Sequence, residues 1–157
     1  MRLATIYQRT LAEFVGTALL LATVVGSGIM AESLCRDNTG LALLCNAVAT
    51  GGGLLALILT FGPISGAHFN PVVTLAAAAE GELSKRDVPL YLVAQFVGAL
   101  VGVGLADLMF DMAAFSLSTH ARTGPAQWLS ESVATFGLLT TIFCVSRRNP
   151  TATPVAV

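Results

Sequence analysis

The polar groups with the clearest chemical use lie in one short segment, Ser65–Leu75. Asn70 followed by Pro71 is a helix-start signal, because Asn caps a helix and Pro fits its first position. The Asn70 amide nitrogen can donate a hydrogen bond to a passing water or hydroxyl oxygen, and the carbonyls of residues 66–68 can accept one. A donor beside a row of acceptors favours a file of small uncharged polar molecules. The segment reads Ser65-Gly66-Ala67-His68-Phe69-Asn70-Pro71-Val72-Val73-Thr74-Leu75.

The helix that Asn70 begins is too short to cross a membrane. Gly81 is a plausible stop, so we expect a helix over Pro71–Ala79. At 1.5 Å per residue it is about 13 Å long, which is roughly half the thickness of the hydrocarbon layer. Its N-terminus then lies near the midplane, where the positive end of the helix dipole repels cations, including hydronium.

The short helix lies in a stretch without charge that is too long for one crossing. From Asn38 to Ala79 there are 42 residues and no Asp, Glu, Lys or Arg. Two complete spans are disfavoured, because Gly62-Pro63 and Gly66 break the helix. We therefore expect a re-entrant segment that dips to the midplane and returns to the same face. Irregular backbone at that depth must be buried in protein or line a water-filled cavity.

The composition is that of a membrane protein. Hydrophobic residues make up 55% of the 157 residues and charged residues only 11%, against about 25% charged in ordinary soluble domains. Four apolar segments have the length of a transmembrane helix. They run over Leu11–Met30, about Leu41–Phe61, between Asp87 and Asp107, and over Trp128–Val145. The predicted fold class is therefore an all-α membrane protein with four spans and one re-entrant half-helix.

Charge also limits the function classes and sets an orientation. A net charge of −1 gives no basic surface for nucleic acid. No cluster of nucleophile, base and orienting group suggests an enzyme, and no spacing suggests a metal or cofactor. Under four spans, six of the eight Lys and Arg residues lie on one side, which predicts that both termini are cytoplasmic. Those six are Arg2, Arg9, Lys85, Arg86, Arg147 and Arg148.

Ser65–Thr74 resembles the first signature loop of the aquaporin or major intrinsic protein family, in the manner of an aquaglyceroporin. Val72 departs from it, since the family usually has alanine there. Tyr91–Ala99 is similar to the family's third span, in which a buried glutamine recurs, here Gln95. The resemblance implies passive transport of water or glycerol-like solutes in the plasma (inner) membrane. It also implies a homo-oligomer, a tetramer in this family, or a complementing second half.

Two glutamates mark an internal repeat. Glu13-Phe14-Val15-Gly16-Thr17 matches Glu131-Ser132-Val133-Ala134-Thr135 at an offset of 118. A glutamate near the start of a span is costly and by default functional, although an interfacial position is the plainer alternative. The resemblance implies that the glutamate of one repeat braces the signature loop of the other. We therefore expect Glu131 to accept hydrogen bonds around His68, and Glu13 to lack its partner.

The same resemblance divides the chain into a first repeat with its following loop, 1–127, and the start of a second repeat, 128–157. A second signature loop falls beyond Val157, so the chain is interpreted as truncated after the fourth span. The filter position on the second span falls on Thr50, and a small residue there indicates a wider filter. Two alternatives stay open: a non-conducting membrane remnant, and a half-transporter with a broken helix.

Overall fold

Helices account for 81% of the described chain. The structure is a computed structural model that describes residues 4–115 and 123–157, and these residues contain no strand. The all-α fold class predicted from the sequence is confirmed. The elements are α1 Ile6–Cys35, α2 Thr39–Ser65, α3 Pro71–Ala79, α4 Val88–Met109, α5 Pro125–Arg148, the 3-10 helix η1 Pro150–Ala152, and α6 Thr153–Ala156.

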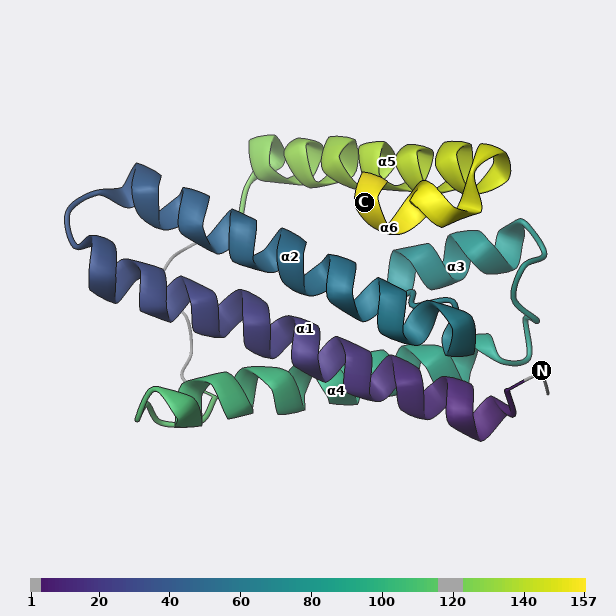
Figure 1. Cartoon of the computed structure of the whole chain (residues 1–157), viewed down its shortest axis with the longest axis horizontal. Coiled ribbons are helices and arrows are strands. Elements are labelled where there is room, and N and C mark those ends of the chain that lie inside the picture. The colour runs from purple at the N-terminus through teal and green to yellow at the C-terminus, as the bar shows by residue number, and fades with distance from the viewer. Residues whose placement is uncertain (1–3, 116–122) are drawn as a thin grey trace. The chain divides into compact units, whose positions relative to one another are not determined.

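The chain forms two compact units, Met1–Ser116 and Leu117–Val157. In the first unit α1 packs along both α2 and α4, and α3 packs against α4 (Figure 1). The second unit holds α5, η1 and α6. The division into repeat segments 1–127 and 128–157 stays a prediction.

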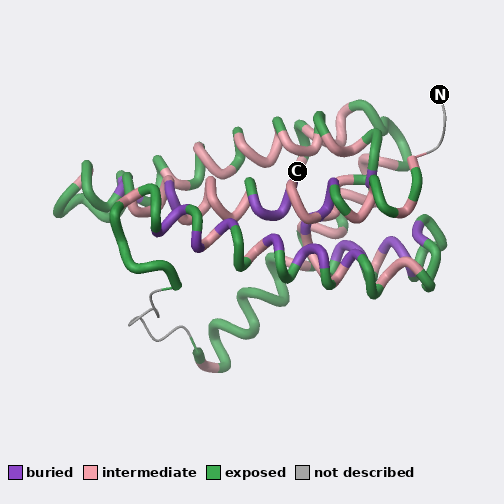
Figure 2. The backbone as a smooth tube through the Cα atoms, turned by 90° about the horizontal axis from the view of Figure 1, so that it is seen from below, coloured by how far each residue is buried: buried purple, intermediate pink, exposed green. Residues whose placement is uncertain are grey.

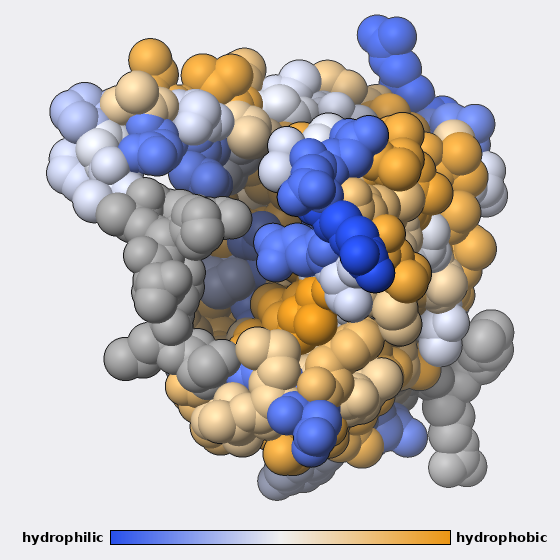
Figure 3. All heavy atoms as spheres, turned by 90° about the vertical axis from the view of Figure 1, so that its left-hand side faces the viewer, coloured by the Kyte–Doolittle hydropathy of each residue, from blue (hydrophilic) through white to orange (hydrophobic). Residues whose placement is uncertain are grey.

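Four of the described helices are long and apolar enough to cross a membrane, and they are α1, α2, α4 and α5. Each of the four predicted spans lies within one of them. The turn between α1 and α2 lies at one end of the first unit. Figure 3 looks onto that end, where hydrophilic side chains gather beside strongly hydrophobic ones. This pattern is typical of the end of a span that meets the membrane surface.

The short helix α3 has the bounds that the sequence predicts, Pro71–Ala79, with Asn70 as its N-cap. The predicted break at Gly62-Pro63 is wrong, because α2 continues through Pro63 to Ser65. A proline this near the C-terminus removes one hydrogen bond and leaves the helix only two more residues to run. The break predicted at Gly66 is confirmed, because the helix ends there: its φ of 93° is left-handed and its N–H bonds to the Gly62 carbonyl.

The segment after α5 is partly helical. It contains η1 and α6. Proline is at home in the first turn of a helix, and both Pro150 and Pro154 occupy such positions.

Glycine lets α1 and α4 approach closely. A Cβ on Gly98 would meet the Phe14 carbonyl oxygen, and one on Gly102 would overlap with the Ala18 carbonyl oxygen. Both glycines are buried, and Figure 2 shows buried residues recurring at intervals along the helices of this unit. The Gly98–Gly102 pair is thus the GxxxG contact by which membrane helices bring their backbones together.

We predict that Gly102→Ala lowers the stability of the first unit. The new methyl group would run into the rigid backbone of α1, and overpacking of this kind costs about 1–3 kcal/mol. Thermal unfolding followed by circular dichroism in detergent measures the effect. Gly52→Ala in α2 is the matched control, because a methyl group added there would have nothing within 4 Å. Equal melting temperatures for the two variants would show that the α1–α4 contact is looser than described.

Candidate functional site

A fully buried carboxylate holds the loop between α2 and α3. Glu13, on α1, has no exposed surface. Its Oε1 accepts from the Ser65 hydroxyl at 2.6 Å and from the His68 N–H at 3.0 Å. Its Oε2 accepts from the Phe69 N–H at 2.8 Å and from the Gln95 side-chain amide at 2.8 Å. One side chain therefore joins α1, α2, α4 and the 66–70 loop.

The prediction that Glu131 braces the loop around His68, while Glu13 has no partner, is wrong. Glu13 does not lack a partner, and it accepts the amides around His68 that were assigned to Glu131. Glu131 lies on α5 in the second unit, where its side chain is exposed. The physical reason is local: α1 packs directly against α2 and α4, so the glutamate of α1 reaches the loop that follows α2.

Thr74 connects the start of α3 to the same network. Its hydroxyl accepts from the Gln95 amide at 2.8 Å and lies 3.1 Å from the Asn70 carbonyl oxygen. The His68 Nδ1 is 3.1 Å from the same hydroxyl. If the threonine proton goes to the Asn70 carbonyl, both other contacts must be donors, which gives the His68 ring a proton on Nδ1.

The loop backbone is held in an unusual conformation. Ala67 and Phe69 have positive φ values of 52° and 48°, a region that residues other than glycine occupy only when their surroundings enforce it. The buried Phe69 ring lies against Gly16, where any side chain would overlap it. It also meets Phe61 edge-on, with ring centroids 6.0 Å apart. The hydrogen bonds to Glu13 and the packing of the Phe69 ring together hold the backbone in this conformation.

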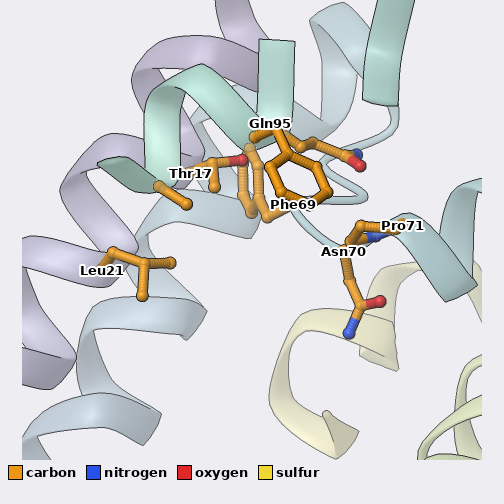
Figure 4. Close-up of a pocket in the computed structure, with 8 residues that line it drawn as sticks. Thr17, Leu21, Phe69, Asn70, Pro71 and Gln95 are labelled. Atoms are coloured by element: carbon orange, nitrogen blue, oxygen red, sulfur yellow. The ribbon is translucent and has the colours of Figure 1, made fainter. Parts of the chain in front are cut away.

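Among the unpaired polar groups are those of the loop that the sequence singled out. Among the described residues no donor bonds to the carbonyls of residues 66–69. The Asn70 Oδ1 caps α3 by accepting from the Val72 N–H at 2.8 Å. Its amide nitrogen donates to no residue in the described part of the chain. Figure 4 shows the Asn70 side chain extending away from Phe69 and Gln95.

Asn70 and Pro71 line a cavity of about 290 Å³ within the first unit. Thr17 and Gln95 also line it, and each carries a buried polar atom with no partner among the described residues, the Thr17 hydroxyl and the Gln95 Oε1. The remaining lining residues, Leu21, Phe69, Phe96 and Ala99, are apolar. An apolar wall with a few convergent polar groups is the usual form of a site for a small ligand.

The other predicted site residues are placed as follows. Thr50 lies inside α2, half-buried, and its hydroxyl has no partner among the described residues. Val72 lies in the first turn of α3 and is 43% exposed. Neither lines the cavity beside Asn70.

Sequence reasoning missed three residues of this network, Ser65, Thr74 and Tyr91. The Tyr91 hydroxyl donates to the Ser65 carbonyl at 2.8 Å. All three lie in segments that the sequence analysis had picked out. Ser65 and Thr74 are the first and last residues of the signature segment, and Tyr91 is the first residue of the segment that contains Gln95. The pattern did not show that these side chains meet.

Comparison with known proteins identifies the family. The family model described as major intrinsic protein matches residues 1–156. The chain belongs to the major intrinsic protein family. This agrees with the resemblance found in Ser65–Thr74, and the family consists of channels rather than enzymes.

Individual relatives of this family give finer likenesses. The chain is 52% identical to "Aquaglyceroporin AqpS" of Rhizobium meliloti (strain 1021), over 94% of this chain and 63% of the relative. It is 35% identical to "Aquaporin PIP2-7" of Musa acuminata, over 91% of this chain and 54% of the relative. It is 33% identical to the "Probable glycerol uptake facilitator protein" of Thermotoga maritima, over 82% of this chain and 60% of the relative. The chain thus spans less than two thirds of the length of each.

We predict that Glu13→Gln destabilises the 66–70 loop. The new amide NH₂ replaces one acceptor oxygen, so two donors that now bond to it lose their partner, at about 1–3 kcal/mol each. The melting temperature in detergent should fall, and hydrogen exchange at His68 and Phe69 should speed up. Glu131→Gln is the control, because that side chain is exposed on α5. A Glu13→Gln protein as stable as the control would exclude Glu13 as the brace.

Proposed function

We propose that this chain forms half of the wall of a channel for the passive passage of water and small uncharged solutes. The observation that carries the proposal is the 66–70 loop. Its backbone amides at His68 and Phe69 are bound by Glu13, while its carbonyls at residues 66–69 and the Asn70 amide nitrogen are left unpaired among the described residues. In an apolar surrounding such groups are costly unless a polar partner meets them. A file of water or hydroxyl groups supplies that partner.

The chemistry of the loop favours neutral solutes. The N-terminus of α3 lies at Asn70, so the positive end of its dipole faces the region that the solute passes. That end repels cations, while a neutral hydroxyl can accept from Asn70 and donate to the carbonyls. Support for glycerol-like solutes comes from the small Thr50 and from the relatives named as an aquaglyceroporin and a glycerol uptake facilitator.

A half-transporter is the second candidate, and the geometry argues against it. Coupling to protons requires an ionisable group that is free to bind and release a proton. Glu13 is occupied by four donors. Nothing in the comparisons favours a non-conducting remnant. The complementing half of the constriction, on the same or another chain, must bring a second half-helix from the opposite face, because α3 covers only about 13 Å of the bilayer.

The proposed setting is the plasma membrane, with both termini in the cytoplasm and a homo-oligomer as the assembled form. The positions of the arginine and lysine residues support this orientation, because positive charges gather on the cytoplasmic side of a membrane protein. Arg9 and Lys85 lie on the side that is proposed to be cytoplasmic, and Arg36 lies in the turn between α1 and α2.

We predict that Asn70→Asp lowers solute flux while keeping the short helix capped. Aspartate caps a helix as well as asparagine does but offers no amide donor. Loss of one such hydrogen bond corresponds to roughly a fivefold decrease in solute flux. Asn70→Ala removes both roles and should also lower the melting temperature.

The measurement is osmotic water and glycerol flux in proteoliposomes. The test protein is a chimaera in which residues 1–148 are followed by the aligned remainder of the Rhizobium meliloti relative. The 157-residue chain alone should show no more flux than empty liposomes. A folded chimaera without flux would contradict the channel, and flux from the chain alone as a monomer would contradict the need for a second half.

We predict that Arg36 and Lys85 lie on opposite sides of the membrane. Each is replaced by cysteine in a variant whose native cysteines, Cys35, Cys45 and Cys144, are serine. An impermeant thiol reagent added outside intact cells should label position 36 and leave position 85 unlabelled until the cells are broken. Labelling of both from one side would overturn the proposed topology.

A further inference from the structure

Tyr91 connects the first turns of α1 to the end of α2. The side chain is on α4 and has no exposed surface. Its hydroxyl accepts from the Arg9 Nε at 3.0 Å and donates to the Ser65 carbonyl at 2.8 Å. Three helices, α1, α2 and α4, therefore meet at one oxygen atom.

The direction of these hydrogen bonds is settled by Arg9. A guanidinium group has only donors, so the phenol oxygen must accept from it. The single hydroxyl proton is then available for the Ser65 carbonyl. Arg9 is itself held, because its Nη1 lies 3.5 Å from Asp87 and its guanidinium carbon lies 5.4 Å from the Tyr91 ring centroid.

Ser65 is the residue at which the helix changes into the loop. The last carbonyls of a helix have no partner within it, and Ser65 is the last residue of α2. Its carbonyl is bound by Tyr91, and its hydroxyl donates to Glu13 and lies 3.1 Å from the Ala67 N–H, which donates to it. The residue is thus held from both sides, and the free carbonyls begin immediately after it.

We propose that Arg9 and Tyr91 are positioning residues for the row of carbonyls at residues 66–68. By binding the Ser65 carbonyl, Tyr91 sets the point at which α2 stops and the direction in which the next carbonyls leave it. Arg9 acts through Tyr91, because it orients the hydroxyl. That these carbonyls meet a permeating solute rests on the proposed function, whereas the positioning itself does not.

The test measures hydrogen exchange at the amides of residues 67–69 in the 157-residue chain, reconstituted in liposomes. In Tyr91→Phe the ring remains and the hydroxyl is lost. Exchange at these amides should speed up about fivefold, the factor for one ordinary hydrogen bond. Tyr7→Phe is the matched control, because Tyr7 is also a tyrosine of the first unit but is 84% exposed. Exchange in the interiors of α1 and α4 should stay unchanged in both variants.

A double-mutant cycle separates orientation through Tyr91 from a general contribution of Arg9 to stability. Arg9→Met should speed exchange in the loop, and Arg9→Lys should restore part of the protection because it retains a charged donor. The double variant Arg9→Met, Tyr91→Phe should exchange no faster than Tyr91→Phe alone.

Two results would overturn the inference: unchanged loop exchange in Tyr91→Phe, or strictly additive effects in the double variant. Neither depends on solute flux. If the chimaera conducts nothing while the exchange results hold, the proposed function fails and the positioning of the loop by Arg9 and Tyr91 stands.

Discussion

The structure depends on one interaction, the binding of two loop amides by the buried carboxylate of Glu13. Residues 66–70 leave the helix at a depth where no bulk water is expected, so each backbone N–H there needs a protein acceptor. A carboxylate is the strongest acceptor available and offers two oxygens with room for four donors. Glu13 uses this capacity fully, on Ser65, His68, Phe69 and Gln95.

The helix packing follows from that requirement. Glu13 on α1 and Gln95 on α4 must both reach the loop, so their helices must approach more closely than large side chains allow. Gly98 and Gly102 on α4, set against the carbonyls of α1, permit this approach, and Gly16 on α1 leaves room for the Phe69 ring. The glycines are therefore part of the same construction as the carboxylate, although they make no hydrogen bond with it.

The network also sorts the polar groups of the loop into two sets. Its amides at residues 67–69 are bound from the inside, by Ser65 and Glu13. Its carbonyls at residues 66–69 and the Asn70 amide nitrogen are left for other partners. Because the protein binds the backbone amides of the loop, the backbone carbonyls stay free in a row. This row of acceptors is what lets an irregular segment serve the passage of neutral solutes.

Much of the fold was predictable because membranes impose simple rules on sequence. The lengths of the apolar segments predicted the four spans. Asn70-Pro71 and the stop at Gly81 predicted both ends of α3, since helix starts and stops are local properties of the sequence. Pro63 was misread, because the cost of a proline depends on how much helix follows it. Gly66, through its left-handed conformation, ends α2 instead.

The sequence by itself determined that this is a helical membrane protein of a channel family with a half-helix that starts at Asn70. Only the tertiary structure decided which glutamate braces the loop. The sequence match indicated that Glu13 and Glu131 occupy equivalent places in a predicted repeat, but such equivalence does not say which loop each carboxylate reaches. That choice depends on which helices pack together, and α1 lies against α2 and α4. The role of Tyr91 was also decided by the tertiary structure. Its hydroxyl and the Ser65 carbonyl are 26 residues apart in the chain, and they meet only because the helices pack together.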